Sequence, residues 1–155
     1  MYIFTEIITN PFLIVPALSW IIAQVVKAIV NGIVNKKFSW VRLFGDGGMP
    51  SGHSATVSSL ATLVGIYEGF GSAEFGIATI FAIVVMHDAL GVRRETGKQA
   101  LSIIEMAGVL NDYLSERDEQ IKTDKLKVFM GHTPWQVVIG SLLGIVIAIV
   151  YNVIF

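Results

Sequence analysis

A histidine inside a glycine-rich turn is the feature of this chain best suited to chemistry. The turn is Gly47-Gly48-Met49-Pro50-Ser51-Gly52-His53-Ser54, and the run without fixed charge that it opens continues to Tyr67. The backbone N–H groups of such a turn and the dipole of the helix that follows favour a bound anion. A histidine at that position can move a proton near neutral pH. An ordinary turn before a helix start at Ser51 is the alternative interpretation of this stretch alone.

A second histidine and several bases could act on the same anion. His132 stands two residues before a charge-free run of 22 residues, and Arg93 and Arg94 follow another apolar segment. Guanidinium groups suit phosphate oxygens, although anchoring of a helix at the membrane interface is an alternative role for both arginines. Asp88 is expected to pair with a nearby base, and the acids show no metal-ligand spacing. Three bases precede the turn, as contacts for headgroups or for the anion: Lys36, Lys37 and Arg42.

The composition places these residues in a membrane. Hydrophobic residues make up 54% of the 155 residues and charged residues 15%, with a mean hydropathy of +0.68. These values are far from those of soluble domains. The N-terminus lacks the basic region and cleavage pattern of a signal peptide, so the first apolar segment is expected to stay in the mature chain. There is no cysteine. We expect a single membrane-embedded domain over 1–155 and no nucleic-acid partner.

Four apolar runs are expected to span the bilayer, at 7–26, 50–67, about 73–90 and 134–155. A helix of about 20 residues crosses the hydrocarbon core. The second run is rich in serine and threonine, so we expect it to lie among the other helices with its hydroxyl groups bonded across their interfaces. Lys27 is expected to extend toward the headgroups. A helix at about 98–114 is too short and polar for a secure span and is predicted to be interfacial or partly re-entrant. The predicted fold is an all-α polytopic bundle.

Alternate crossing of these spans puts the loops 27–49 and 91–133 on one side of the membrane. His53, His132, Arg93 and Arg94 then converge at one depth. Lysine and arginine are concentrated on this side, and such an excess marks the cytoplasmic side. The pattern therefore predicts a cytoplasmic site and outward termini.

Two motifs resemble a known family. Pro50-Ser51-Gly52-His53 is similar to the central signature of the type 2 phosphatidic acid phosphatase superfamily, which includes lipid phosphatases, bacterial acid phosphatases and vanadium haloperoxidases. The stretch from Gly131 and His132 to Gly144 is similar to the third motif, a histidine, an aspartate and a helix of small residues. The short chain and the stretch 88–100 resemble the small, divergent bacterial branch of that superfamily. A bacterial plasma membrane is the location that this resemblance implies.

The resemblance implies a mechanism without metal or other cofactor. His132 would attack phosphorus and form a phosphohistidine, and His53 would protonate the leaving oxygen. Ser51 and Gly52 would be oxyanion donors, and lysine and arginine side chains would hold the other oxygens. Gln136 stands where the family has the aspartate that orients the nucleophile.

Two further departures concern the bases. Leu126 stands where the family's third motif has an arginine, so Arg93 or Arg94 would have to supply that charge. The lysine and Arg-Pro of the family's first motif are absent, since Lys36 and Arg42 are six residues apart without the proline.

The leading expectation is a membrane phosphatase acting on a lipid phosphate or pyrophosphate, such as phosphatidylglycerophosphate, phosphatidate or a polyprenyl diphosphate. The alternative is a non-catalytic binder or transporter of an anionic phospholipid or polyprenyl phosphate. A purely structural membrane subunit is a third hypothesis, which leaves the cluster of bases and histidines unexplained. A homodimer is a further expectation.

Overall fold

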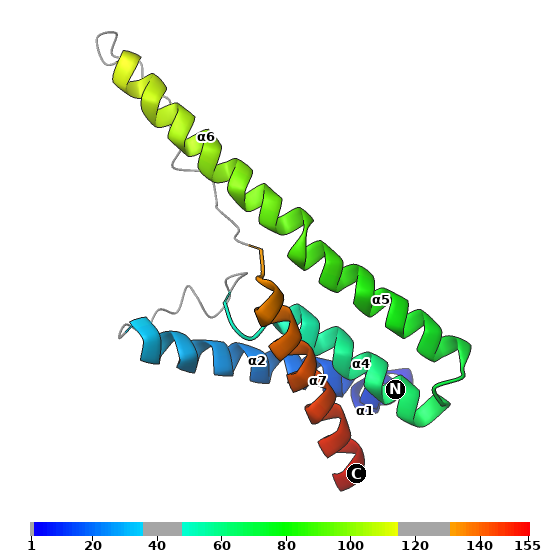
Figure 1. Ribbon diagram of the computed structural model, residues 1–155. Helices are drawn as coiled ribbons and strands as arrows, with labels where there is room; N and C mark the ends of the chain where they lie inside the picture. The colour runs from blue at the N-terminus through cyan, green and yellow to red at the C-terminus, as the bar shows by residue number, and fades with distance from the viewer. Residues whose placement is uncertain (1, 36–47, 115–130) are drawn as a thin grey trace.

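The computed structural model describes residues 2–35, 48–114 and 131–155, and the regular structure in these ranges is helical. The helices are α1 (Tyr2–Thr9), α2 (Pro11–Asn35), α4 (Gly52–Glu68), α5 (Ala73–Leu90), α6 (Val92–Leu114) and α7 (Pro134–Ile154), as Figure 1 shows. Within the described ranges, three stretches are long and apolar enough to cross a membrane: Pro11–Ile33, Ala73–Tyr113 and Pro134–Ile154. The predicted all-α membrane bundle is confirmed. The candidate bases Lys36, Lys37 and Arg42 lie outside the described residues.

Helix α4 is the centre of the bundle and packs against α7, α2 and α5. It begins after Ser51, whose extended backbone and side-chain oxygen cap the helix by accepting the Ser54 N–H at 3.3 Å. It ends before Gly69, which has a positive φ of 90° that glycine tolerates best. The expectation that this polar helix lies among the others is confirmed by its buried residues, which include Ser54, Ser58 and Ser59.

Several hydroxyl groups of α4 bond within their own helix rather than across its interfaces. Thr56 donates to the Gly52 carbonyl at 2.9 Å, Ser59 to the Thr56 carbonyl at 2.8 Å, and Thr62 to the Ser58 carbonyl at 2.7 Å. Back-bonding of this kind satisfies a hydroxyl without a partner helix. These side chains therefore serve close packing, and the expectation of hydrogen bonds across the interface is not met for these three.

Two glycines of α7 set its distance from α4. A Cβ atom on Gly140 would overlap the backbone carbonyl oxygen of Ser51, and one on Gly144 would overlap that of Ala55. The two contacts are four residues apart on both helices, so the helices touch backbone to backbone over one turn. This contact brings the start of α7 against the start of α4.

The first predicted span, 7–26, differs from the structure at both ends. The chain breaks at Asn10, whose side chain accepts the Phe12 N–H at 2.9 Å and caps α2, with Pro11 in the first helical position. Helix α2 then continues to Asn35. The apolar run therefore covers the end of α1 and only part of α2.

The predicted helix at about 98–114 begins earlier, at Val92. Gly91 ends α5 with its N–H bonded to the His87 carbonyl at 2.8 Å, and α6 follows at once. Figure 1 shows α6 extending away from the bundle beyond α5, the only described helix that it contacts appreciably. Charged residues begin where the apolar stretch ends, and this change in polarity does not mark a helix boundary. Most residues after Val92 are good helix formers, so the helix begins there. The position of α6 relative to the bilayer stays a prediction.

Candidate active site

The structure brings the two histidines of the predicted site together. The ring centroids of His53 and His132 are 6.0 Å apart, with the ring planes at 62°. His53 is half-buried in the first turn of α4, and His132, just before α7, is only 2% exposed. At this separation a phosphoryl group can contact both rings, because reacting atoms approach to about 3 to 3.5 Å.

Gln136 holds the ring of His132 through its side chain. The Gln136 Oε1 atom lies 3.2 Å from His132 Nδ1 and also accepts the backbone N–H of Thr133 at 3.1 Å. Because that N–H can only donate, the atom facing it must be the amide oxygen. The same oxygen faces Nδ1, so Nδ1 carries the hydrogen and Nε2 keeps its lone pair. In the neutral ring, Gln136 therefore selects the tautomer in which Nε2 carries the lone pair.

Backbone hydrogen bonds tie the glycine-rich turn to α7 and the segment before α7 to α5. The Ser51 N–H donates to the Gln136 carbonyl at 3.0 Å, and the His132 N–H donates to the Ala89 carbonyl at 3.0 Å. Residues from α4, α5 and α7 thus meet around the two histidines. The backbone N–H of Ser51 is already bonded to the Gln136 carbonyl and cannot also serve a bound oxyanion. The expected oxyanion role of Ser51 therefore depends on its hydroxyl hydrogen.

Ser51 and Gly52 also have structural roles at this point. The Ser51 side-chain oxygen accepts from the Ser54 hydroxyl at 3.0 Å, and both serines are fully buried. A Cβ atom on Gly52 would lie 3.1 Å from Trp20 Cδ1 and 3.4 Å from Gln24 Nε2, so these two side chains of α2 would have to shift slightly to admit a side chain. Gly52 therefore permits close contact between α2 and the start of α4.

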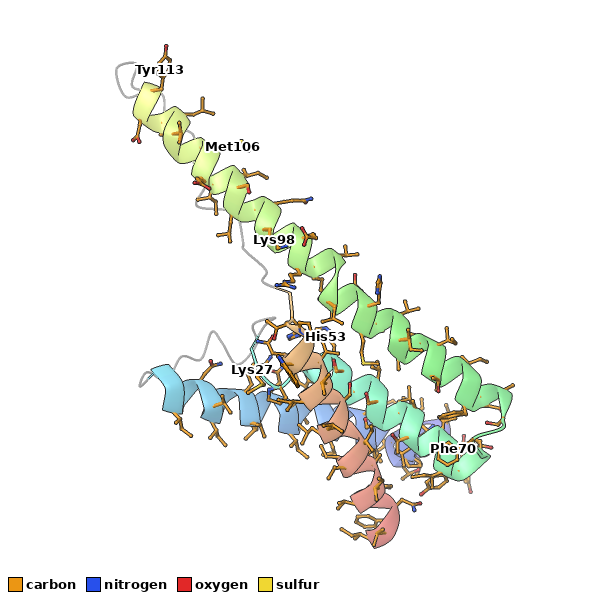
Figure 2. The ribbon with its side chains drawn as sticks, in the orientation of Figure 1. Lys27, His53, Phe70, Lys98, Met106 and Tyr113 are labelled. Carbon is orange, nitrogen blue, oxygen red and sulfur yellow. The ribbon has the colours of Figure 1, made fainter. Side chains whose placement is uncertain are left out.

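Lys27 is a candidate that our sequence reasoning missed. It lies in α2 and is only 2% exposed, so the expectation that it extends toward the headgroups is wrong. A Cβ atom on Gly48 would lie 3.4 Å from both Cγ and Cδ of Lys27, which places the lysine stem against the glycine-rich turn. Figure 2 shows Lys27 and His53 toward the same end of the bundle, with Phe70 at the other end of α4. An ionisable residue buried in a membrane helix indicates a functional site.

The sequence does contain a signal for Lys27. Trp20, Gln24, Lys27 and Asn31 recur at steps of four, three and four residues, which puts them on one face of a helix. The first two lie against Gly52 and the last two against Gly48. This face of α2 is therefore the one that packs on the turn.

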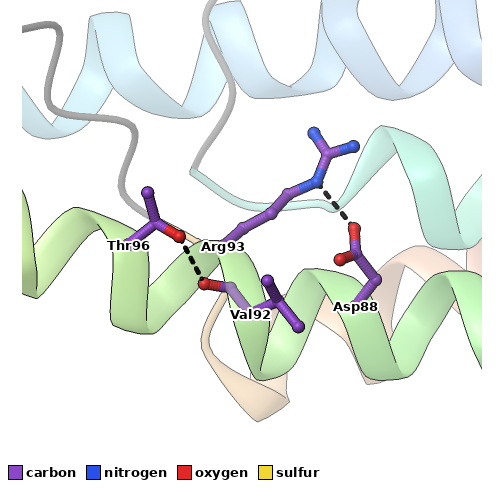
Figure 3. Close-up of polar contacts among 4 residues, drawn as sticks. All are labelled: Asp88, Val92, Arg93 and Thr96. Atoms are coloured by element: carbon purple, nitrogen blue, oxygen red, sulfur yellow. Dashed lines mark hydrogen bonds and ion pairs between the residues drawn. The ribbon is translucent and has the colours of Figure 1, made fainter.

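The two arginines occupy different places around the site. Arg93 Nε is 2.8 Å from Asp88 Oδ2, an ion pair with both side chains more than two-fifths exposed (Figure 3). The backbone of Arg94 lies against Gly131, where a Cβ atom would overlap it, so Arg94 adjoins the residue before His132. Its side chain is exposed. Asp88 therefore has the expected basic partner. Arg93 lines the same groove as His53, and the backbone of Arg94 lies beside the residue before His132.

A groove of about 990 Å³ borders one side of the site. It runs between α2, α4 and α5, and its lining includes His53, Asp88 and Arg93. Across the described part of the chain, no group of three histidine, aspartate or glutamate side chains is placed to hold a metal ion.

Comparison with known proteins agrees with the two motifs. The sequence profile of a family described as the divergent PAP2 family matches residues 8–147. The chain is also similar to a protein of Bacillus subtilis (strain 168) described as the uncharacterized membrane protein YuiD. The two are 38% identical over 151 residues, which cover 94% of this chain and 96% of that protein. No solved structure matches the chain.

Proposed function

The chain belongs to the divergent PAP2 family, and from this membership and the geometry of the site we propose that it is a membrane lipid phosphatase. Its substrate is a lipid phosphate or pyrophosphate, and the reaction passes through a phosphohistidine. The observation that carries the proposal is the pair of histidine rings 6.0 Å apart, of which His132 is buried and held by Gln136. A site within a bundle of apolar helices favours a substrate supplied by the bilayer.

The reaction follows from the different surroundings of the two histidines. Nε2 of His132 attacks phosphorus, the bond between phosphorus and the lipid oxygen breaks, and protonated His53 gives its proton to that oxygen. Neutral His53 then removes a proton from water, which attacks the phosphohistidine. Inorganic phosphate leaves, and both histidines return to their starting states.

Lys27, Arg94 and the start of α4 provide positive charge for the phosphate oxygens in this proposal. The N-terminus of a helix favours anions, and pre-placed donors stabilise the charge of a transition state most effectively where water is excluded. Arg93 begins the reaction paired with Asp88. A contribution to phosphate binding from Lys36, Lys37 or Arg42 is a separate prediction. Measurements of kcat and KM on their alanine variants test it.

We place the site at the cytoplasmic face of a bacterial plasma membrane because lysine and arginine are concentrated in the loops on the histidine side. A homodimer remains part of the proposal. Cysteine-labelling of the two chain ends in intact cells tests the orientation, since outward termini should react with an impermeant reagent.

Gln136 is the observation that favours the alternative function, a non-catalytic binder or transporter of an anionic lipid. An amide holds the tautomer of His132 but cannot stabilise an imidazolium with a full charge, as an aspartate would. That function predicts tight binding of phosphate lipids or vanadate without turnover. Both functions share the pocket, so only turnover separates them.

The test of the proposal is release of inorganic phosphate from purified protein in detergent. The panel contains phosphatidate, phosphatidylglycerophosphate and a polyprenyl diphosphate, each with the wild type, His53→Ala and His132→Ala. We expect each substitution alone to abolish phosphate release without changing the helix content of the protein. Release that survives both substitutions would remove the assignment, and binding without release would establish the alternative.

A further inference from the structure

The groove beside His53 has its charged groups at one end. His53 opens α4, and Asp88 and Arg93 lie on either side of the junction of α5 and α6. Most of the remaining lining is aliphatic or aromatic, and includes Phe12, Leu60 and Phe81. A cavity with this distribution suits an amphiphile whose polar part lies at His53.

The apolar end of the groove extends toward the opposite end of the bundle. Trp20, at the histidine end, lies against Gly52, whereas Phe12 stacks edge-to-face on Tyr67 near the other end of α4, with ring centroids 5.5 Å apart. The lining of α2 extends from Phe12 to Ile21, which is about 13 Å at the helical rise. One leaflet is about half of a hydrocarbon core of roughly 30 Å. The groove is therefore about as deep as one leaflet.

Only one of the two histidines borders the groove. His53 is part of its lining, whereas the buried His132 is not. If phosphorus lies between the rings, the oxygen on the side of His53 is the one that leaves. The group attached to that oxygen then extends into the groove.

We propose that the groove between α2, α4 and α5 binds the hydrocarbon chain of the lipid alcohol that leaves, and that the lipid enters sideways from the leaflet on the histidine side. This inference rests on the proposed function for the identity of the polar end. The occupant is a lipid with a terminal phosphate, because the groove combines an apolar length of one leaflet with His53 and Arg93 at its end.

The first test measures binding without catalysis. Trp20 lines the groove, so it is kept as the only tryptophan in the full-length chain carrying Trp40→Phe, Trp135→Phe and His132→Ala. Phosphatidate with brominated acyl chains is titrated into this protein in detergent, and brominated phosphatidylcholine serves as the control lipid. We expect saturable quenching of Trp20 by the phosphatidate, reversed by excess unbrominated phosphatidate.

The second test fills the groove and measures turnover. Ala17 lines the groove and is exposed in it, so Ala17→Phe should obstruct the chain. We expect kcat/KM to fall about tenfold or more for long-chain phosphatidate and to stay within about twofold for glycerol 3-phosphate. Val146→Phe, at a 55% exposed position of α7 away from the groove, is the matched control and should change neither value.

The outcomes separate this inference from the proposed function. Cleavage of phosphatidate by the wild type, with no quenching of Trp20 and no effect of Ala17→Phe, overturns the groove alone. Saturable quenching without cleavage by the wild type overturns the phosphatase and retains the groove. Equal quenching by brominated phosphatidylcholine identifies unspecific uptake of hydrocarbon, and equal loss of both activities in Ala17→Phe identifies a general disturbance, so either result overturns the inference.

Discussion

Gln136→Leu should slow phosphoryl transfer without removing either histidine. Leucine has a similar size but accepts no hydrogen bond, so the substitution leaves the Thr133 N–H and Nδ1–H of His132 without their acceptor at 3.1 and 3.2 Å. Of the two residues His132 is the buried one, and a buried donor that loses its partner costs about 1 to 3 kcal/mol. If that cost falls on the transition state, the rate decreases roughly 5- to 150-fold, since about 1.4 kcal/mol corresponds to a factor of ten. A shift to the other tautomer of His132 would add to this loss.

Gln136→Glu is the matched control. Glutamate retains an acceptor for both N–H groups, preserves the cap of α7 and adds a charge beside the imidazolium that forms on attack. We expect the phosphoryl-transfer rate of this variant to equal or exceed that of the wild type. The leucine variant should also lose about 1 kcal/mol of stability through the missing cap, so thermal unfolding is measured in parallel.

The assay is a rapid-quench single-turnover experiment with radiolabelled lipid phosphate and excess enzyme. It reports the rate of phosphoryl transfer separately from product release. A leucine variant that is folded, dependent on His132 and within twofold of the wild-type rate would refute the role of Gln136.

Three other predictions follow from the same structure. Gly140→Ala should cost about 1 to 3 kcal/mol in unfolding free energy and reduce activity at least tenfold, because its Cβ overlaps the Ser51 carbonyl oxygen. Gly76→Ala, whose Cβ meets nothing within 4 Å, should lower neither value. Lys27→Met should raise KM for phosphate lipids about tenfold or more, and this rise should not depend on ionic strength because the charge is buried. Lys98→Met, at a 60% exposed side chain, should leave KM unchanged. The pH dependence of kcat/KM should be bell-shaped, since the attacking imidazole must be neutral and the acid protonated.

The bundle and the meeting of the histidines were accessible from the sequence. Apolar run length and the positions of charges placed His53 and His132 on the same side, because alternate crossing leaves few arrangements. The helix start considered at Ser51 agrees with the structure, where Ser51 is the N-cap of α4 and the cap depends on neighbouring residues alone. These features need no knowledge of how the helices are rotated about their axes.

Features that depend on helix rotation were missed. Lys27 at the end of an apolar run is compatible with either the headgroups or the interior, and only the packing of α2 on Gly48 and Gly52 decides between them. The hydroxyl groups of α4 have the same ambiguity, because bonds within the helix and across an interface use the same residue types. The break at Asn10 was a local signal, an asparagine before a proline, that the long apolar run obscured.

The central claim is that His132 carries the phosphoryl group during turnover. Lipid phosphate labelled on phosphorus is mixed with enzyme, and the reaction is quenched in alkali within one turnover and analysed by mass spectrometry of peptides. The account predicts an alkali-stable, acid-labile phosphohistidine at His132 that is absent from His132→Ala. Phosphate release at the wild-type rate with no label on His132, or label on any other residue, would contradict it.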